Sequence, residues 1–290
     1  MAGEDRDEDL AGAASTVRAY LLLEHPGPWG VAVLRDARLP EGLGTALQGA
    51  AREAGAKLLL IRRPGRYPAG EPARRRLFAV YADPASPWTE TTLLDGPEDL
   101  LDLDVARLRE GRSLGLERHD DPVFAVCTHG RHDACCAERG RPAVAALAAA
   151  LPEHTWEVSH IGGDRFAANM VVAPDGLYYG RLTPEAALGV ARARLRGELE
   201  LDHLRGRSGY PMPVQAAEIA LRRHLGVVAL DGLKLVSATV EGADTTAVFA
   251  AGPAPYTVRV RSTPGEPVLL TCRAVREQRP LRHEILAIER

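Results

Sequence analysis

The chain has 290 residues, of which 46% are hydrophobic and 26% are charged, and its formal net charge is −3. This balance is typical of a globular protein with room for two compact domains. The charge gives no electrostatic reason to expect nucleic acid or an anionic membrane as a partner. No stretch approaches the ~18 consecutive apolar residues of a membrane span.

The first fifteen residues are acidic and carry six charges, which predicts a disordered tail over residues 1–15. They lack the basic and apolar regions of a signal peptide. The four cysteines, two of them adjacent, do not resemble a disulfide framework. We therefore expect a cytoplasmic protein.

Residues 16–115 form the first predicted unit, which contains no cysteine. Its hydrophobic pattern predicts the order strand, helix, strand, strand, strand, helix. The strands are expected at 17–23, 57–62, 77–82 and 89–94, and the helices at 43–54 and 100–108. We expect this unit to serve as a scaffold or to dock a partner.

Residues 121–196 repeat that order. Strands are expected at 123–126 and 155–158, a helix at 143–151, a hairpin at 168–173 and 177–181, and a last helix after Thr183 as N-cap. The simplest account is an α/β fold, α+β by some schemes, made of tandem thioredoxin-like units. Charge and glycine predict a linker or helix end at 197–207. Residues 210–290 are expected to form a small α+β C-terminal domain, with a helix at 213–225 and strands in 226–260.

The second unit concentrates soft metal ligands after its first two strands. Cys127 and Cys136 have eight residues between them, and His160 and Asp164 have three. Loops that follow adjacent strands can converge on one point, and the glycines at 162–163 would let the backbone approach a bulky group. This pattern predicts an iron–sulfur site.

The motifs CTHGRHDACC, SHIGG, RFAAN and DGLYYGRLTPE resemble the sucrase/ferredoxin-like family, whose members resemble thioredoxin-like [2Fe-2S] ferredoxins. The resemblance covers residues 17–195 and is strongest in 123–185. It implies a [2Fe-2S] cluster, electron transfer or redox sensing, and a redox partner protein. Cys127 and Cys136 fall on the first ligand pair of these ferredoxins, and His160 and Asp164 fall on the second.

In the eukaryotic branch of the family, the second ligand pair resembles a His-x-x-x-His motif. This chain has Asp164 in place of the second histidine of that motif. Three residues compete as fourth ligand. Asp164 has the right spacing and ranks first, Cys272 is a softer donor and ranks second, and Cys135 ranks last because adjacent side chains diverge. A histidine in place of a thiolate is expected to raise the reduction potential.

Other residues near these motifs have simpler explanations. For His129 and His132 a loop-capping or solvent-facing role is favoured over a proton relay. Arg131 and Arg165 could balance negative charge or be merely exposed. We expect Asp133 and Asn169 to form hydrogen bonds in turns and loops. We expect Trp88 and Trp156 to pack in the core.

Two other classes of function compete. Two cysteines, a histidine and a carboxylate also suit a structural zinc-binding module that mediates protein interactions, although zinc loops usually space their cysteines two to four residues apart. Sucrose hydrolysis is not supported, because the motif region supplies neither a facing carboxylate pair nor a Gly-x-Ser-x-Gly elbow. No Cys-x-x-Cys dithiol is present. We expect an electron carrier rather than a stand-alone enzyme.

Overall fold

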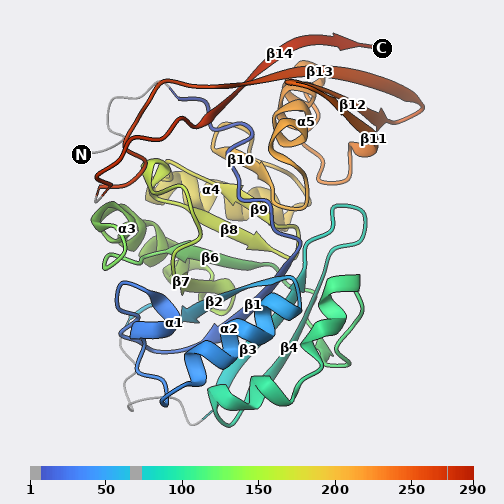
Figure 1. The fold of residues 1–290 in the computed structure, drawn as a ribbon. Coiled ribbons are helices and arrows are strands. Elements are labelled where there is room, and N and C mark those ends of the chain that lie inside the picture. The colour runs from blue at the N-terminus through green and yellow to red at the C-terminus, as the bar shows by residue number, and fades with distance from the viewer. Residues whose placement is uncertain (1–7, 66–73, 273) are drawn as a thin grey trace.

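A ten-stranded mixed sheet and a four-stranded antiparallel sheet organise the computed structural model, which describes residues 8–65, 74–272 and 274–290 (Figure 1). The strand order in the large sheet is β10-β9-β8-β6-β7-β2-β1-β3-β4-β5, and in the small sheet it is β11-β12-β13-β14.

The first half of the large sheet agrees with the pattern predicted for residues 16–115. Its strands are β1 (Ala19–Glu24), β2 (Ala56–Arg62), β3 (Arg75–Tyr81) and β4 (Trp88–Leu94), and its helices are α1 (Val33–Asp36) and α2 (Leu43–Glu53). The single helix predicted at 100–108 is wrong. Two 3₁₀ helices, η1 (Pro97–Asp102) and η2 (Val105–Glu110), replace it because Leu103 between them has an extended backbone.

The second half contains the elements predicted for residues 121–196. They are β6 (Val123–Cys127), α3 (Ala134–Ala150), β7 (Thr155–Val158), β8 (Met170–Ala173), β9 (Leu177–Tyr179) and α4 (Pro184–Leu195). Thr183 caps α4 by accepting a hydrogen bond from the Ala186 backbone. Helix α3 begins nine residues earlier than predicted, because Asp133 caps it at Cys135 N.

The two halves share one strand order. β2-β1-β3-β4 in the first half corresponds to β7-β6-β8-β9 in the second, with β1 parallel to β2 and β6 parallel to β7. Strands β2 and β7 join the halves in antiparallel pairing, with Ile61 opposite Val158. The strands of the predicted repeat therefore have the same order in both halves, whereas the closing helix of the first unit is replaced by η1 and η2.

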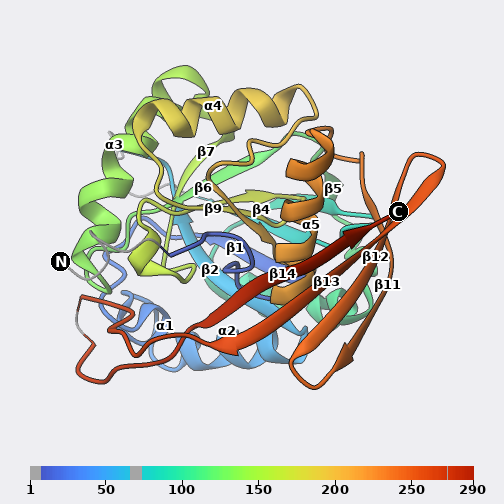
Figure 2. The ribbon, with the colours of Figure 1, turned by 90° about the horizontal axis from the view of Figure 1, so that it is seen from above.

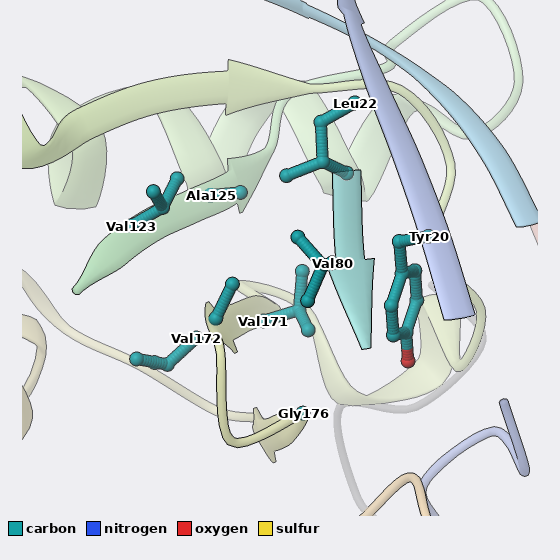
Figure 3. Close-up of a pocket in the computed structure, with 9 residues that line it drawn as sticks. Tyr20, Leu22, Val80, Val123, Ala125, Val171, Val172 and Gly176 are labelled. Atoms are coloured by element: carbon teal, nitrogen blue, oxygen red, sulfur yellow. The ribbon is translucent and has the colours of Figure 1, made fainter. Parts of the chain in front are cut away.

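The sheet bends so that the two halves also pack face to face. Figure 3 shows Tyr20, Leu22 and Val80 of the first half opposite Val123, Ala125 and Val171 of the second. They enclose a cavity of about 10 Å³ with almost no polar surface, so it is a packing gap and not a ligand site. The outer faces are covered by α1 and α2 in one half and by α3 and α4 in the other. Both Trp88 and Trp156 are buried, as predicted.

Two predictions based on charge are wrong in part. Residues 8–15 are not a free tail, because Leu10 and Ala14 are buried and Gly12 N donates to Arg205 O; residues 1–7 lie outside the described part. The segment 197–207 is predicted to be a linker or a helix end. Helix α4 does end beside it, with Arg196 as C-cap, but the segment also contains the buried strand β10 (Leu204–Arg207), which pairs with β9. This charged segment can be buried because the guanidinium groups of Arg205 and Arg207 donate hydrogen bonds to Asn169 and Glu218.

The C-terminal unit is α+β in outline, as predicted. Helix α5 (Met212–Leu225) packs against the sheet of β11 (Lys234–Glu241), β12 (Asp244–Ala251), β13 (Ala254–Pro264) and β14 (Leu281–Glu289) (Figure 2). A two-residue strand, β5 (Glu117–Arg118), ends the large sheet. The boundaries proposed for the separate units stay predictions.

A buried ion triad ties α5 to the large sheet. Glu218 Oε1 of α5 lies 2.9 Å from Arg207 Nε of β10 and 2.9 Å from Arg222 Nε. All three side chains are buried, and the two guanidinium groups also donate to the Leu230 carbonyl. Burial alone would raise the pKa of Glu218, but the two arginines lower it below its usual value.

We expect Glu218→Gln to reduce the free energy of unfolding by about 3–5 kcal/mol, because it leaves two buried guanidinium groups uncompensated. Since the folded pKa is lowered, the wild-type contribution is present above the unfolded pKa of about 4.3 and is lost as pH falls through the folded value. Urea denaturation at several pH values measures both effects. Glu198→Gln is the matched control, because this carboxylate is 38% exposed and pairs with the exposed Arg196. An equal loss in both variants would contradict the role of the triad.

Candidate metal centre

Parallel pairing of β6 with β7 sets the position of the site. Cys127 is the last residue of β6 and pairs with Val158, the last residue of β7. The loop that carries His160 therefore begins beside Cys127, at the carboxyl edge of the sheet. Ligand sites in α/β sheets commonly lie at this edge.

Cys136 reaches the same edge from the first turn of α3, and not from a loop as predicted. Gly140 lets α3 lie directly on the end of β6, because a Cβ at this position would come within 2.1 Å of Cys127 O. A residue with a side chain at position 140 would push Cys136 away from Cys127.

The four residues predicted as ligands converge. One donor atom from each of Cys127, Cys136 and His160 lies within 4.8 Å of the other two. Asp164, which begins the 3₁₀ helix η4 (Asp164–Phe166), places Oδ1 2.9 Å from His160 Nδ1 and 3.3 Å from Cys136 Sγ. A second group of donors with the same 4.8 Å limit consists of His132, His160 and Asp164.

This donor set fits a metal. Two sulfurs, an imidazole nitrogen and a carboxylate oxygen are ligands of zinc and of iron. His160 Nδ1 and Asp164 Oδ2 are buried, yet neither makes a hydrogen bond of good geometry with any described residue. The 2.9 Å contact of His160 Nδ1 with Asp164 Oδ1 is thus an electrostatic one. Buried polar atoms left in this way point to a missing partner.

The protonation of the site is strongly perturbed. The Cys136 thiol and then His160 lower the pKa of Cys127, whereas hydrogen bonding to Cys127 raises the pKa of Cys136. Burial opposes the charged form of His160, but Asp164 and Cys127 raise its pKa to about 9. These contacts favour the thiolate form of Cys127, the imidazolium form of His160 and the carboxylate form of Asp164. A metal ion would take the place of the protons.

The position of His132 beside the donor atoms was not predicted from the sequence. Its ring stacks on His160 with the centroids 3.8 Å apart, and its Nε2 lies 3.5 Å from Asp164 Oδ2. The sequence feature that could have indicated this position is that His132 precedes Cys136 by four residues and lies just before Asp133, the N-cap of α3. The predicted solvent-facing role holds only in part, because the side chain is 33% exposed but its ring lies against the donors.

His129 is a loop-capping residue, as favoured. Its ring is buried between the two halves, where Nδ1 accepts a hydrogen bond from His160 N at 3.3 Å. Nε2 lies 2.8 Å from Gly30 O and donates to it, because a carbonyl only accepts. Burial lowers the pKa of His129, so the neutral ring holds the His160 backbone in place.

The two glycines of the loop make room for side chains that pack against it. Gly162 and Gly163 have φ values of 103° and 80°, which L side chains rarely adopt. A Cβ on Gly163 would strike the Arg205 guanidinium at 2.3 Å, and one on Gly162 would meet Ser15 Oγ at 2.9 Å. The glycines therefore make room for these supporting side chains, and their predicted role toward a bound group stays a prediction.

Two cations, the buried Arg205 and the half-buried Lys57, support this loop from outside the motif. Arg205 of β10 donates to Gly162 O at 3.0 Å and to Asn169 Oδ1 at 2.8 Å, and Asn169 donates to Gly163 O. Lys57 of β2 donates to Ile161 O at 2.9 Å. Burial lowers the pKa of Lys57 to about 8 and that of Arg205 to about 10. The first half of the chain thus contributes directly to the site.

Cys272 lies away from the four donors and beside Cys135. Their Sγ atoms are 2.9 Å apart, and Cys272 N donates to Asp133 Oδ2. Among the three candidates for fourth ligand, Asp164 is the one for which the structure shows contacts with Cys136 and His160. Of the two nearby arginines, Arg131 is exposed and Arg165 pairs with Glu8.

These features define a mixed α/β protein with clustered cysteine and histidine side chains that could hold a metal. The model of one family, described as sucrase/ferredoxin-like, matches residues 10–206, and the chain belongs to this family. No curated protein and no solved structure matches the chain. Within the described residues, every helix is too short or too polar to cross a membrane.

We expect Arg205→Gln to weaken metal binding about 10–100-fold, because residues that orient a ligand loop commonly contribute that much affinity. Competition with a chromophoric chelator measures the change. Arg165→Gln is the matched control, since that guanidinium pairs with Glu8 instead of the loop. Asn169→Ala removes the same support more gently, and wild-type affinity in both Arg205→Gln and Asn169→Ala would contradict the role of Arg205.

Proposed function

We propose that this protein is a [2Fe-2S] iron–sulfur protein of the sucrase/ferredoxin-like type that acts in electron transfer or redox sensing. Cys127, Cys136, His160 and Asp164 would hold the cluster. One observation carries the proposal: two thiols and an imidazole from three separate elements meet at one sheet edge, beside a carboxylate.

The thiols and the imidazoles would lie on opposite sides of such a group. Cys127 and Cys136 are buried and would anchor it on the protein side. His160 and His132 have side chains 27% and 33% exposed, so the imidazoles form the side nearest solvent. When bound, the cluster supplies a centre that takes up or releases one electron. A redox partner protein would approach on the imidazole side.

The wider setting supports this proposal. The shared order β2-β1-β3-β4 and β7-β6-β8-β9 is what tandem thioredoxin-like units would give, with ligands on the second unit alone. All four cysteines are free thiols, which suits the reducing cytoplasm. We propose both the thioredoxin-like relationship and the cytoplasmic location on these grounds.

A structural zinc site is the second candidate. The donor atoms of Cys127, Cys136 and His160 lie within 4.8 Å of one another, a spacing that one tetrahedral ion can bridge. Such a site would hold α3 against the end of β6 and would make the chain a binding module. The zinc candidate predicts a colourless protein.

Hydrolysis has little support. A Gly-x-Ser-x-Gly pattern does occur outside the motif region, at residues 111–115. However, Ser113 donates its hydroxyl hydrogen to the buried Glu90 and lies between η2 and β5, not on a strand-to-helix turn. We propose an electron carrier and not a sucrose-cleaving enzyme.

We expect protein purified without oxygen to absorb between 300 and 600 nm and to contain iron and acid-labile sulfide in equal amounts. Cys136→Ser should lose most of this absorbance, because it removes a buried ligand. Cys135→Ser, one residue away on the same helix, should keep it. A colourless protein with one zinc per chain would refute the cluster and favour the second candidate.

We expect Asp164→Ala to lose the cluster or shift its visible spectrum, because Asp164 contacts both Cys136 and His160. Cys272→Ser should leave the spectrum unchanged. His132→Ala tests the other neighbour of His160, and we expect a retained cluster with a smaller spectral shift. Loss of the cluster in His132→Ala, with retention in Asp164→Ala, would assign the fourth position to the histidine.

A further inference from the structure

A segment of the C-terminal unit reaches the N-terminus of α3. After β13, residues 265–272 leave the four-stranded sheet and run toward α3, which belongs to the cysteine-bearing half (Figures 1 and 2). We call residues 265–272 the strap. The family match ends at residue 206, so the strap is not part of the family's common region.

One buried carboxylate holds the strap to the helix. Asp133 Oδ1 accepts a hydrogen bond from Cys135 N at 2.9 Å, and Asp133 Oδ2 accepts one from Cys272 N at 2.7 Å. Asp133 is fully buried, so both bonds are shielded from water. The same carboxylate therefore caps α3 and fixes the position of Cys272.

This arrangement brings two thiols together across 137 residues of sequence. Cys135 Sγ and Cys272 Sγ are 2.9 Å apart, against about 2.05 Å in a disulfide. Cys272 is exposed, whereas Cys135 is buried beneath it. A reagent in solution would meet Cys272 first, and Cys135 would then be its nearest thiol.

We propose that Cys135 and Cys272 form a reversible disulfide that ties the strap to α3. The oxidant is a low-molecular-weight disulfide. The Cys272 thiolate attacks it and releases one small thiolate, which leaves a mixed disulfide on Cys272. The Cys135 thiolate then attacks Cys272 Sγ and releases the second small thiolate. The two protein thiols lose two electrons and two protons, and the oxidant becomes two thiols.

A metal at this place is less well supported. The donor group Asp133, Cys135 and Cys272 has the spacing for an ion, but both Asp133 oxygens already accept backbone hydrogen bonds. Only two thiols remain, which is what a disulfide requires. Cys136 cannot readily replace Cys135, because successive helical side chains point about 100° apart and Cys136 faces Asp164.

The disulfide would sit one residue from Cys136 without consuming a proposed cluster ligand. Oxidation would therefore fix the first turn of α3 and the strap while leaving Cys127 and Cys136 free to bind. This separates the inference from the function proposed above: the thiol pair can be tested whether or not a cluster is bound.

The test is oxidation of the full-length protein with oxidised glutathione, alkylation of the remaining thiols and trypsin digestion without reductant. We expect peptide 132–139 to be joined to peptide 262–273, with fragment ions placing the bond on Cys135, and dithiothreitol to release both. Cys135→Ser and Cys272→Ser should each abolish the joined peptide. Cys136→Ser is the matched control and should keep it.

Three outcomes would overturn the disulfide. One is glutathione retained on Cys272 in the wild-type protein with Cys135 still alkylated. Another is a bond from Cys272 to Cys136. The third is an extra equivalent of zinc that protects both thiols and is lost in Cys272→Ser. Failure of the cluster would show separately, as absent visible absorbance in a protein that still forms the joined peptide.

Discussion

The parallel pairing of β6 with β7 is the constraint on which the rest of the site depends. It places the last residue of one strand, Cys127, beside the start of the loop that follows the other. A side chain from that loop must then lie close to the cysteine. Helix α3 crosses between the two strands, so its first turn, with Cys136, returns to the same edge. The connectivity brings the three donors to one edge of the sheet, and local contacts such as the close packing at Gly140 decide how near they come to one another.

The supports of the site come from segments far away in the sequence, and all of these segments lie within the family match. Arg205 in β10 and Ser15 in the N-terminal segment both contact the loop at residues 159–164. Lys57 reaches it from the cysteine-free half. A match over residues 10–206 begins just before Ser15 and ends just after Arg205. It includes the ligands and the cations placed against the loop, whereas the four-stranded sheet lies outside it.

The sequence predicted those parts of the fold that depend on local pattern. Apolar runs located the strands, Thr183 marked the start of α4, and the spacing of soft ligands identified the site. It could not predict parts that depend on distant partners. Strand β10 looked like a linker because its arginines are charged, and their burial follows only once Glu218 and Asn169 are in place. His132 was missed for the same reason, because its contact with His160 crosses two loops.

The adjacent cysteines show why neighbouring residues of one type can serve different purposes. On a helix they point about 100° apart, so Cys136 faces the donors at the sheet edge and Cys135 faces the strap. Asp133 contacts both cysteine-bearing segments. Its Oδ1 caps α3 at Cys135 N, and its Oδ2 accepts a hydrogen bond from Cys272 N. Any change that moves this carboxylate must therefore disturb both the helix start and the strap. Coupling between the two thiol sites would arise from this shared cap and would need no direct contact between them.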